Sequence, residues 1–216
     1  MTKIYSIILG NNNHTLFGAV NDAILIYNLF YTFYLKDKLW GKPVILLNQD
    51  VTIEKILNNI PALSLNDTLI IYFSGHSCKS GKLKFHNSFI SKNNIISNLL
   101  EKFKNNFKLF FIIDSCYSKN FYNKKSSKSY IKYILSSSEI QTSKEILVNY
   151  DENMYSIMEP QKKNKIIHGI FTFYFYKILN SKNLNDIKKW KNEIESNSIW
   201  KFIEKNYSQT TFYIES

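Results

Sequence analysis

The chain has 216 residues and a formal net charge of +11, and 44% of its residues are hydrophobic. This apolar content excludes a disordered chain and suffices for one domain with a substantial core. No apolar run reaches the roughly 18 residues of a membrane-spanning helix, and the N-terminus carries no secretion signal. The two cysteines, Cys78 and Cys116, exclude a disulfide framework. We therefore expect a soluble, cytoplasmic protein without a membrane partner.

The positive charge is carried by lysine alone, because the sequence contains no arginine. A charge of this size raises the question of nucleic-acid binding. The lysines, however, are spread along the chain and form no clustered motif. We expect them on solvated faces and expect no nucleic-acid partner; a basic nucleic-acid-binding protein is a minor alternative.

The first half of the chain alternates strand-like runs with helical patterns. Strands are predicted by short apolar runs at residues 4–9, 43–47, 68–73 and 109–113. Helices are predicted by apolar spacings of three and four at residues 18–33, 53–60 and 92–104. This alternation predicts an α/β fold whose mostly parallel sheet is covered by helices on both faces.

The second half of the chain is organised differently. Residues 119–132 are rich in Lys, Ser and Asn and predict an exposed loop, after which residues 130–135 predict a strand. Helices at 168–179 and within 184–205, and an edge strand at 210–214, complete the expected elements. The sequence has no internal repeat and no long linker, so we expect a single domain over residues 1–216.

Two of the predicted strands end in a reactive side chain. The run 68–73 leads into Ser74-Gly-His76, and the run 109–113 leads into Asp114-Ser-Cys116. Both runs are apolar on both faces, which is typical of buried parallel strands, and open α/β sheets place their sites at the carboxyl ends of such strands. If the two strands are neighbours, a thiol and an imidazole meet at one edge. This pattern predicts Cys116 as a nucleophile with His76 as its base.

The residues around this pair resemble the paired motifs of the metacaspases, a family of caspase-like cysteine peptidases. The two principal matches are Ser74-Gly-His76 and Asp114-Ser-Cys116-Tyr-Ser118. Further blocks match in the family's order: Gly18-Ala-Val-Asn-Asp22-Ala, residues 135–143, Gly169-Ile-Phe-Thr-Phe, and Tyr207-Ser-Gln. The resemblance spans almost the whole chain and implies a compact form without an N-terminal prodomain.

This resemblance implies a caspase-like three-layer sandwich. Residues 1–118 would form a large-subunit-like half, residues 119–129 a loop, and residues 130–216 a small-subunit-like half. The chain is expected to act as a monomer, since most members of the family do.

The activity implied by the resemblance is cleavage of proteins and peptides after Lys or Arg, without a cofactor. Cys116 would attack the scissile carbonyl as the thiolate, and His76 would protonate the leaving amine and then activate water. The backbone N–H groups of Ser77 and Cys116 would hold the oxyanion. Asp22, Ser74 and Asp114 match the family's acidic pocket, where two carboxylates receive charge-assisted hydrogen bonds from the substrate cation.

The chain departs from the family's pattern at two glycines. Ser77 replaces the Gly that usually follows the catalytic His, and Lys119 replaces a Gly after the catalytic Cys. If the first position needs a positive φ, a serine would strain the oxyanion hole. A catalytically weak homologue that binds partners as a scaffold is therefore the alternative function.

We predict that the activity is independent of calcium and that the protein holds no metal. Many metacaspases carry an acidic calcium cluster after the His, but residues 78–90 contain no Asp or Glu. A zinc site formed by His76, Cys78 and Cys116 has the right residue types but matches no established ligand spacing.

Two further features have both a plain and a functional interpretation. Cys78 is either a small filler or a redox partner that blocks Cys116 through a reversible disulfide. The loop 119–132 is either simply solvated or a site of self-cleavage after its lysines, Lys124, Lys125 and Lys128.

Overall fold

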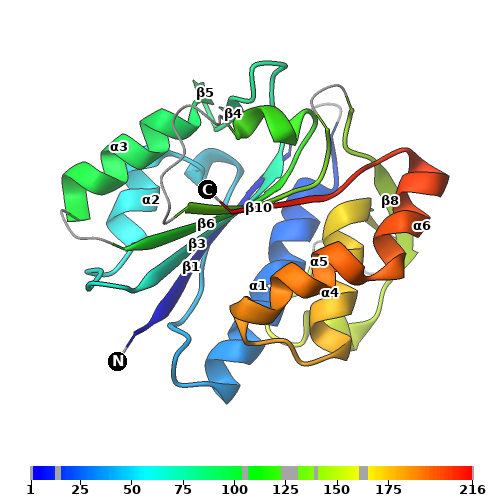
Figure 1. The fold of residues 1–216 in the computed structure, drawn as a ribbon, viewed down its shortest axis with the longest axis horizontal. Coiled ribbons are helices and arrows are strands. Elements are labelled where there is room, and N and C mark those ends of the chain that lie inside the picture. The colour runs from blue at the N-terminus through cyan, green and yellow to red at the C-terminus, as the bar shows by residue number, and fades with distance from the viewer. Residues whose placement is uncertain are drawn as a thin grey trace.

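A central sheet between two layers of helices organises the molecule (Figure 1). The computed structural model describes residues 2–12, 16–103, 107–122, 131–138, 141–160 and 165–215. The main sheet has six strands in the order β10-β7-β6-β3-β1-β2, in which only β10 runs antiparallel to its neighbour. The predicted α/β fold with a mostly parallel sheet is confirmed.

The six strands of this sheet coincide with the six apolar runs of the sequence. They are β1 (Ile4–Asn11), β2 (Val44–Leu47), β3 (Thr68–Gly75), β6 (Lys108–Asp114), β7 (Ile131–Leu135) and β10 (Phe212–Glu215). Two hairpins lie outside it: β4 (Leu83–Lys84) pairs with β5 (Phe89–Ile90), and β8 (Glu145–Asn149) pairs with β9 (Lys165–Gly169). The second hairpin reaches the carboxyl edge of the main sheet and becomes important for the site.

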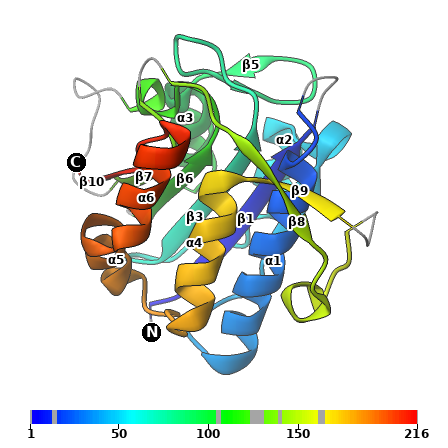
Figure 2. The same ribbon diagram turned by 90° about the vertical axis from the view of Figure 1, so that its right-hand side faces the viewer.

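Helices cover both faces of the sheet (Figures 1 and 2). One face carries α1 (Ala19–Lys36), α4 (Ile170–Ser181), α5 (Trp190–Ser196) and α6 (Ser198–Tyr207); the other carries α2 (Ile53–Asn59) and α3 (Lys92–Phe103). Short 3-10 helices within the described ranges connect these elements: η1 (Asn48–Asp50), η2 (Ser118–Phe121), η4 (Glu152–Tyr155) and η5 (Ile187–Lys189). Within the described ranges, no helix combines the length and apolar character needed to span a bilayer.

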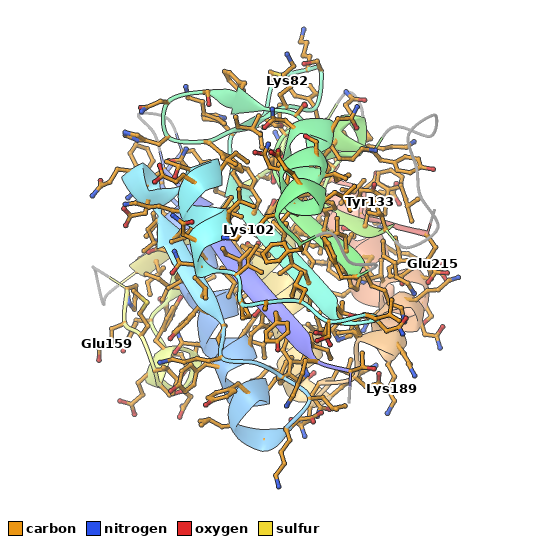
Figure 3. The ribbon with its side chains drawn as sticks, turned by 90° about the vertical axis from the view of Figure 1, so that its left-hand side faces the viewer. Lys82, Lys102, Tyr133, Glu159, Lys189 and Glu215 are labelled. Atoms are coloured by element: carbon orange, nitrogen blue, oxygen red, sulfur yellow. The ribbon has the colours of Figure 1, made fainter. Side chains whose placement is uncertain are left out.

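The core consists of two apolar layers, one on each side of the sheet. All eight residues of β3 are buried, and its side chains alternate between the layers: Ile70 and Tyr72 pack toward α1 and α4, whereas Ile71 and Phe73 pack toward α2 and α3. Figure 3 views the molecule from the α2 and α3 side, with Lys82 at the top, beyond the carboxyl ends of the strands. Burial on both faces explains why these strands read as continuous apolar runs.

One predicted boundary was wrong, and neither hairpin was predicted. The expected helix at 168–179 begins only at Ile170, because His168 and Gly169 belong to β9 and pair with Ile146 and Glu145 of β8. The apolar spacing of the helix continues back into the strand, so periodicity alone places its start too early. The apolar runs of the β8–β9 hairpin, 146–148 and 166–167, are only three and two residues long, which is shorter than the four to eight residues expected of a strand run.

Candidate active site

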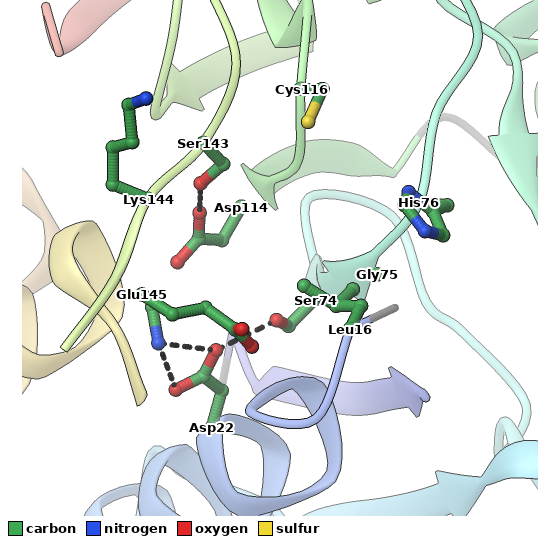
Figure 4. A pocket seen from close by; sticks show the side chains of 11 residues that line it. Leu16, Asp22, Ser74, Gly75, His76, Asp114, Cys116, Ser143, Lys144 and Glu145 are labelled. Atoms are coloured by element: carbon green, nitrogen blue, oxygen red, sulfur yellow. Dashed lines mark hydrogen bonds between the residues drawn. The ribbon is translucent and has the colours of Figure 1, made fainter. Parts of the chain in front are cut away.

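His76 and Cys116 lie just beyond the ends of two neighbouring strands. β3 and β6 pair in parallel, with Ser74 opposite Asp114, so both segments leave the sheet at the same edge. His76 follows β3 directly, and Cys116 follows β6 after the single residue Ser115. Figure 4 shows the thiol and the imidazole on two sides of one pocket, which both residues line. The structure therefore brings the predicted pair together.

Both members of the pair are held toward their neutral forms. Burial raises the pKa of the half-buried Cys116 thiol, and the backbone N–H of Ser143 offsets only part of this effect. Burial also lowers the pKa of the His76 imidazole. Since desolvation disfavours charge on either group, the resting pair is a thiol beside a neutral imidazole rather than a preformed ion pair.

Two buried serines after β7 anchor the backbone that carries Cys116. Ser115 N–H donates to Oγ of Ser136 over 3.2 Å, and Oγ of Ser137 donates to the carbonyl of Ser115 over 2.8 Å. Ser118 N–H also donates to Oγ of Ser137, over 2.9 Å. These contacts lie on both sides of Cys116. Ser136 and Ser137 therefore fix the loop that carries the thiol.

The residue after His76 adopts an ordinary backbone conformation. The non-glycine residues described with a positive φ are Asn48, Asn66, Tyr117, Asn183 and Ser208. Neither Ser77 nor Lys119 is among them, so the conformational strain expected for a serine at a glycine position does not arise. The two departures from the metacaspase pattern leave the backbone unstrained.

The N–H of Ser77 is directed away from the neighbouring strand segment. Ser77 and Leu83 form an isolated antiparallel bridge. The hydrogen bonds of this bridge flank the pair, from Cys78 N–H to the Lys82 carbonyl and from Lys84 N–H to the His76 carbonyl. Ser77 therefore occupies a non-hydrogen-bonded position, in which its own N–H takes no part in the ladder.

The acidic residues predicted for the pocket also meet at this edge. Asp22 lies in the first turn of α1 and is 1% exposed, and Asp114 ends β6 and is 3% exposed. Oδ2 of Asp22 accepts a 2.8 Å hydrogen bond from the hydroxyl of Ser74. All three residues line the same pocket as Cys116 and His76 (Figure 4).

The start of α4 binds both carboxylates. Gly169 N–H donates to Asp22, at 3.0 and 3.1 Å from its two oxygens. Oδ2 of Asp114 accepts from the N–H of Thr172 over 3.2 Å and from its hydroxyl over 2.7 Å. The hydroxyl of Ser143 donates to Oδ1 of Asp114 over 2.6 Å. The positive end of the helix dipole and these donors allow two acids to share one buried site.

Asp114 is the acid whose ionisation is penalised. Burial and, second, the nearby Asp22 raise the pKa of its carboxyl to about 6, against the lowering effect of hydrogen bonds from Ser143 and Thr172. Above this pH the ionised carboxylate of Asp114 adds a buried negative charge to the pocket, beside Asp22. Such a site favours a cation.

Gly169 leaves the space in which the two carboxylates converge. A Cβ at this position would lie 2.3 Å from Oδ2 of Asp114 and 2.9 Å from Oδ2 of Asp22. Both distances are shorter than any real contact, so a side chain would displace the acids. The φ of Gly169 is −61°, so it is space rather than backbone conformation that requires glycine here.

The β8–β9 hairpin adds pocket residues that the sequence analysis missed. Glu145 pairs with Gly169 in the hairpin and lines the pocket (Figure 4). Its Oε1 accepts hydrogen bonds from Gly18 N–H at 2.6 Å and Phe17 N–H at 3.2 Å, so it caps the start of α1. Burial raises the pKa of Glu145. His168, the second residue missed, donates to or accepts from Asp22 behind the pocket, with 2.8 Å between Nδ1 and Oδ1.

Comparison with models of known protein families identifies the family of this domain. The family described as the caspase domain, a peptidase family, matches residues 4–207. The chain therefore belongs to the caspase-domain family, and its sheet and helix layers form a caspase-like fold. Membership of this family indicates a cysteine peptidase with protein substrates. A search of curated proteins finds none that matches the chain.

The remaining site predictions have different outcomes. Lys124, Lys125 and Lys128 lie outside the described residues. Among the residues that are described, no group of three or more His, Cys, Asp and Glu side chains is arranged to hold a metal ion, so the zinc alternative at Cys78 finds no support. The thiol of Cys78 instead lies 3.0 Å from the hydroxyl of Ser80.

Proposed function

We propose that the protein is a metacaspase-like cysteine endopeptidase that cleaves peptide bonds after Lys or Arg, using Cys116 and His76. One observation carries this proposal: the carboxylates of Asp22 and Asp114 converge above Gly169, in the pocket that Cys116 and His76 also line. The residue before the cut would enter this pocket while its carbonyl carbon meets the thiol.

The charge of the pocket supports a basic residue at that position. Each of the two buried carboxylates already has protein donors, yet Asp114 ionises above a pKa of about 6 and then places a buried negative charge beside Asp22. An ammonium or guanidinium supplies charge-assisted hydrogen bonds and neutralises the repulsion. A neutral side chain would leave the carboxylates buried without a counter-charge from the substrate, at a cost of about 3 to 5 kcal/mol.

The proposed reaction is acyl transfer through a thioester. Cys116 Sγ bonds to the carbonyl carbon while its proton passes to the neutral imidazole of His76. The C–N bond then breaks, and the imidazolium returns the proton to the leaving amine. Water attacks the thioester as His76 removes a proton, and this releases the acid and restores the thiol.

The oxyanion would be held by the backbone N–H groups of Ser77 and Cys116. Support for Ser77 comes from its position in the bridge to Leu83, which leaves its N–H outside the ladder. Each such donor typically contributes about 100- to 1000-fold in rate.

The wider proposal concerns conditions and context. We propose calcium-independent activity, because residues 78–90 contain no carboxylate to bind the ion. We also propose that the protein is a monomer in the cytoplasm and has no nucleic-acid partner. Sedimentation of the purified 25.5 kDa chain would test the oligomeric state. Self-cleavage after Lys124, Lys125 or Lys128 would appear as a mass change in wild type but not in Cys116→Ala.

The alternative function is a catalytically weak homologue that acts as a protein-binding scaffold. The ordinary backbone at Ser77 and Lys119 removes the strain on which this alternative was based. It is therefore the less favoured of the two.

Fluorogenic peptides test the proposal. Peptides with Arg, Lys, citrulline or Asp before the cut should be compared for wild type and Cys116→Ala, with calcium and with a chelator. We expect cleavage after Arg and Lys that is lost in the variant and unchanged by the chelator. No cleavage of any peptide by the folded, reduced protein would instead support the scaffold, and a large calcium stimulation would contradict the proposed independence.

A further inference from the structure

A buried row of hydrogen-bonded side chains lies behind the acidic pocket. The hydroxyl of Tyr155 is 2.5 Å from Nε2 of His168, whose Nδ1 is 2.8 Å from Oδ1 of Asp22. The exposed fractions are 2% for Tyr155, 0% for His168 and 1% for Asp22. Burying three polar groups is costly unless each hydrogen bond is made. Core packing alone does not explain such a row.

Three separate elements contribute to the row, and ring contacts fix its geometry. Tyr155 ends η4, His168 lies in β9, and Asp22 lies in the first turn of α1. Tyr150 stacks on the ring of Tyr155 with 5.6 Å between centroids, and Phe173 stacks on His168 at 6.0 Å. These stacked rings hold the phenol and imidazole planes, and so they also hold the direction of each hydrogen bond.

The donors and acceptors along the row follow from the carboxylate at its end. A carboxylate oxygen accepts, so the N–H at Nδ1 of His168 donates to Oδ1 of Asp22. The Tyr155 hydroxyl is the partner of the other ring nitrogen, Nε2. Burial, with Asp22 as the next cause, raises the pKa of Tyr155 far above its usual value, so the phenol keeps its proton and adds no charge to the row.

This arrangement orients the Asp22 carboxylate. The imidazole occupies Oδ1, whereas Oδ2 accepts from the Ser74 hydroxyl at 2.8 Å and faces the space above Gly169. Oδ2 of Asp114 faces the same space. The row therefore holds one oxygen of Asp22 from behind and leaves the other directed at the pocket.

We propose that His168 and Tyr155 are positioning residues for substrate recognition, which hold the Asp22 carboxylate aimed at the cation of the residue before the cut. This role depends on the proposed Lys or Arg specificity. Neither side chain lines the pocket, so both would act on the substrate only through Asp22. Their removal should therefore weaken recognition of charge more than the chemistry at Cys116.

Matched substrates separate this role from a purely structural one. Two fluorogenic peptides would differ only in arginine or its uncharged isostere citrulline before the cut. The variants are His168→Leu, which removes both hydrogen bonds, and His168→Asn, whose amide can still donate to Asp22. The steady-state constants kcat and KM would be measured for both peptides.

We expect His168→Leu to lower kcat/KM for the arginine peptide about 10- to 100-fold, mainly through KM, and for the citrulline peptide less than about threefold. His168→Asn should recover most of the loss. An equal fall for both peptides would show a merely structural role and overturn the proposal, as would an unchanged arginine preference. If wild type shows no preference for arginine, the proposed function itself fails, which is a distinct outcome.

Tyr155→Phe keeps the test available if His168 variants do not fold. It removes one oxygen atom and leaves the stacked ring, so we expect a smaller loss of about three- to tenfold confined to the arginine peptide. Tyr150→Phe is the matched control, because it makes the same chemical change one ring away, outside the row. Equal effects of the two tyrosine variants would overturn the role of the row.

Discussion

The hydroxyl of Ser77 donates a hydrogen bond to the backbone carbonyl oxygen of Cys116. This contact joins the segment after His76 directly to the residue that carries the thiol. A glycine at position 77 could not make it. The serine therefore adds a connection between the two halves of the candidate dyad, without the backbone strain that a positive φ would impose.

We predict that Ser77→Ala lowers kcat about three- to tenfold and leaves KM nearly unchanged. The loss corresponds to one hydrogen bond, about 1 kcal/mol, that helps to place the Ser77 N–H and the Cys116 backbone around the same oxyanion. Peptide hydrolysis under saturating substrate measures this directly. Ser88→Ala, an exposed serine in the following loop, is the matched control and should behave as wild type.

The variant Ser77→Gly tests whether Ser77 assists catalysis or impairs a site that would be more active with glycine. If the contact with Cys116 assists catalysis, this variant should be no more active than Ser77→Ala. A variant more active than wild type would instead show that Ser77 impairs the site.

Most of the predicted site residues lie at the ends of two strands; Asp22, in α1, was predicted from the family resemblance alone. His76, Ser74, Cys116 and Asp114 each follow a run buried on both faces, and such runs are visible without knowledge of the fold. Pairing in register then brings these residues to the same edge. Fold class and dyad placement therefore follow from local patterns.

The hairpin residues could not be found in this way. Glu145 and Gly169 line the pocket, and His168 lies behind it, because β8 pairs with β9, which is a contact between segments about 20 residues apart in the chain. The apolar runs of this hairpin are only two or three residues long, so they do not predict a strand. His168 was assigned to a helix because the apolar spacing of α4 runs into it; its role required the tertiary contact with Asp22.

Asp114→Asn should stabilise the protein at pH 8 while it weakens recognition of basic substrates. The pKa of Asp114 is raised from 3.8 to about 6, so the folded state holds this proton more tightly than the unfolded state. The stability associated with the protonated form is complete below about pH 4 and is lost as the pH rises through about 6. At 1.36 kcal/mol per pKa unit, the loss is roughly 3 kcal/mol at most.

Urea unfolding at pH 4 and pH 8 tests this expectation. The variant should gain stability at pH 8 and show little change at pH 4, and its KM for an arginine peptide should rise at least about tenfold. Asp50→Asn, at a surface ion pair with Lys55, is the control and should change little at either pH. A variant destabilised at pH 8 would mean that the charged carboxylate supports the fold.

Gly169→Ala should close the pocket without disabling the thiol. The added Cβ would fall 2.3 Å from Oδ2 of Asp114 and 2.9 Å from that of Asp22, so the carboxylates must move apart. We expect kcat/KM for arginine peptides to fall at least about 100-fold, while alkylation of Cys116 by iodoacetamide, which needs no pocket, stays within about twofold.

Gly41→Ala is the matched control for the pocket variant. Its Cβ would also be too close to a neighbour, at 2.6 Å from the ring of Tyr5, but far from the pocket. The two variants can therefore lose similar stability, measured by thermal unfolding, while only Gly169→Ala loses arginine recognition. Loss of recognition in both would attribute the effect to general destabilisation.

The two thiols should differ in their reactivity in the resting protein. Although burial raises the pKa of Cys78, hydrogen bonds from Ser80 and from backbone N–H groups lower it more, so the net shift is downward. The pKa of Cys116 is raised by burial. Because the thiolate is the reactive form, iodoacetamide at pH 7 should label Cys78 several-fold faster than Cys116, as measured by peptide mass mapping.

The pH profile of Cys116 labelling tests whether the dyad rests in its neutral form. With a raised thiol pKa and a lowered His76 pKa, labelling should keep rising through pH 9 instead of levelling off near pH 7. His76→Ala should then change the labelling rate by less than about threefold, yet lower peptide hydrolysis by about 100-fold or more, because the imidazole acts only once the substrate is bound. Cys78→Ser, which leaves a single thiol, keeps the measurement free of interference. A labelling plateau below pH 7 that disappears in His76→Ala would reveal a preformed thiolate–imidazolium pair and contradict the neutral dyad.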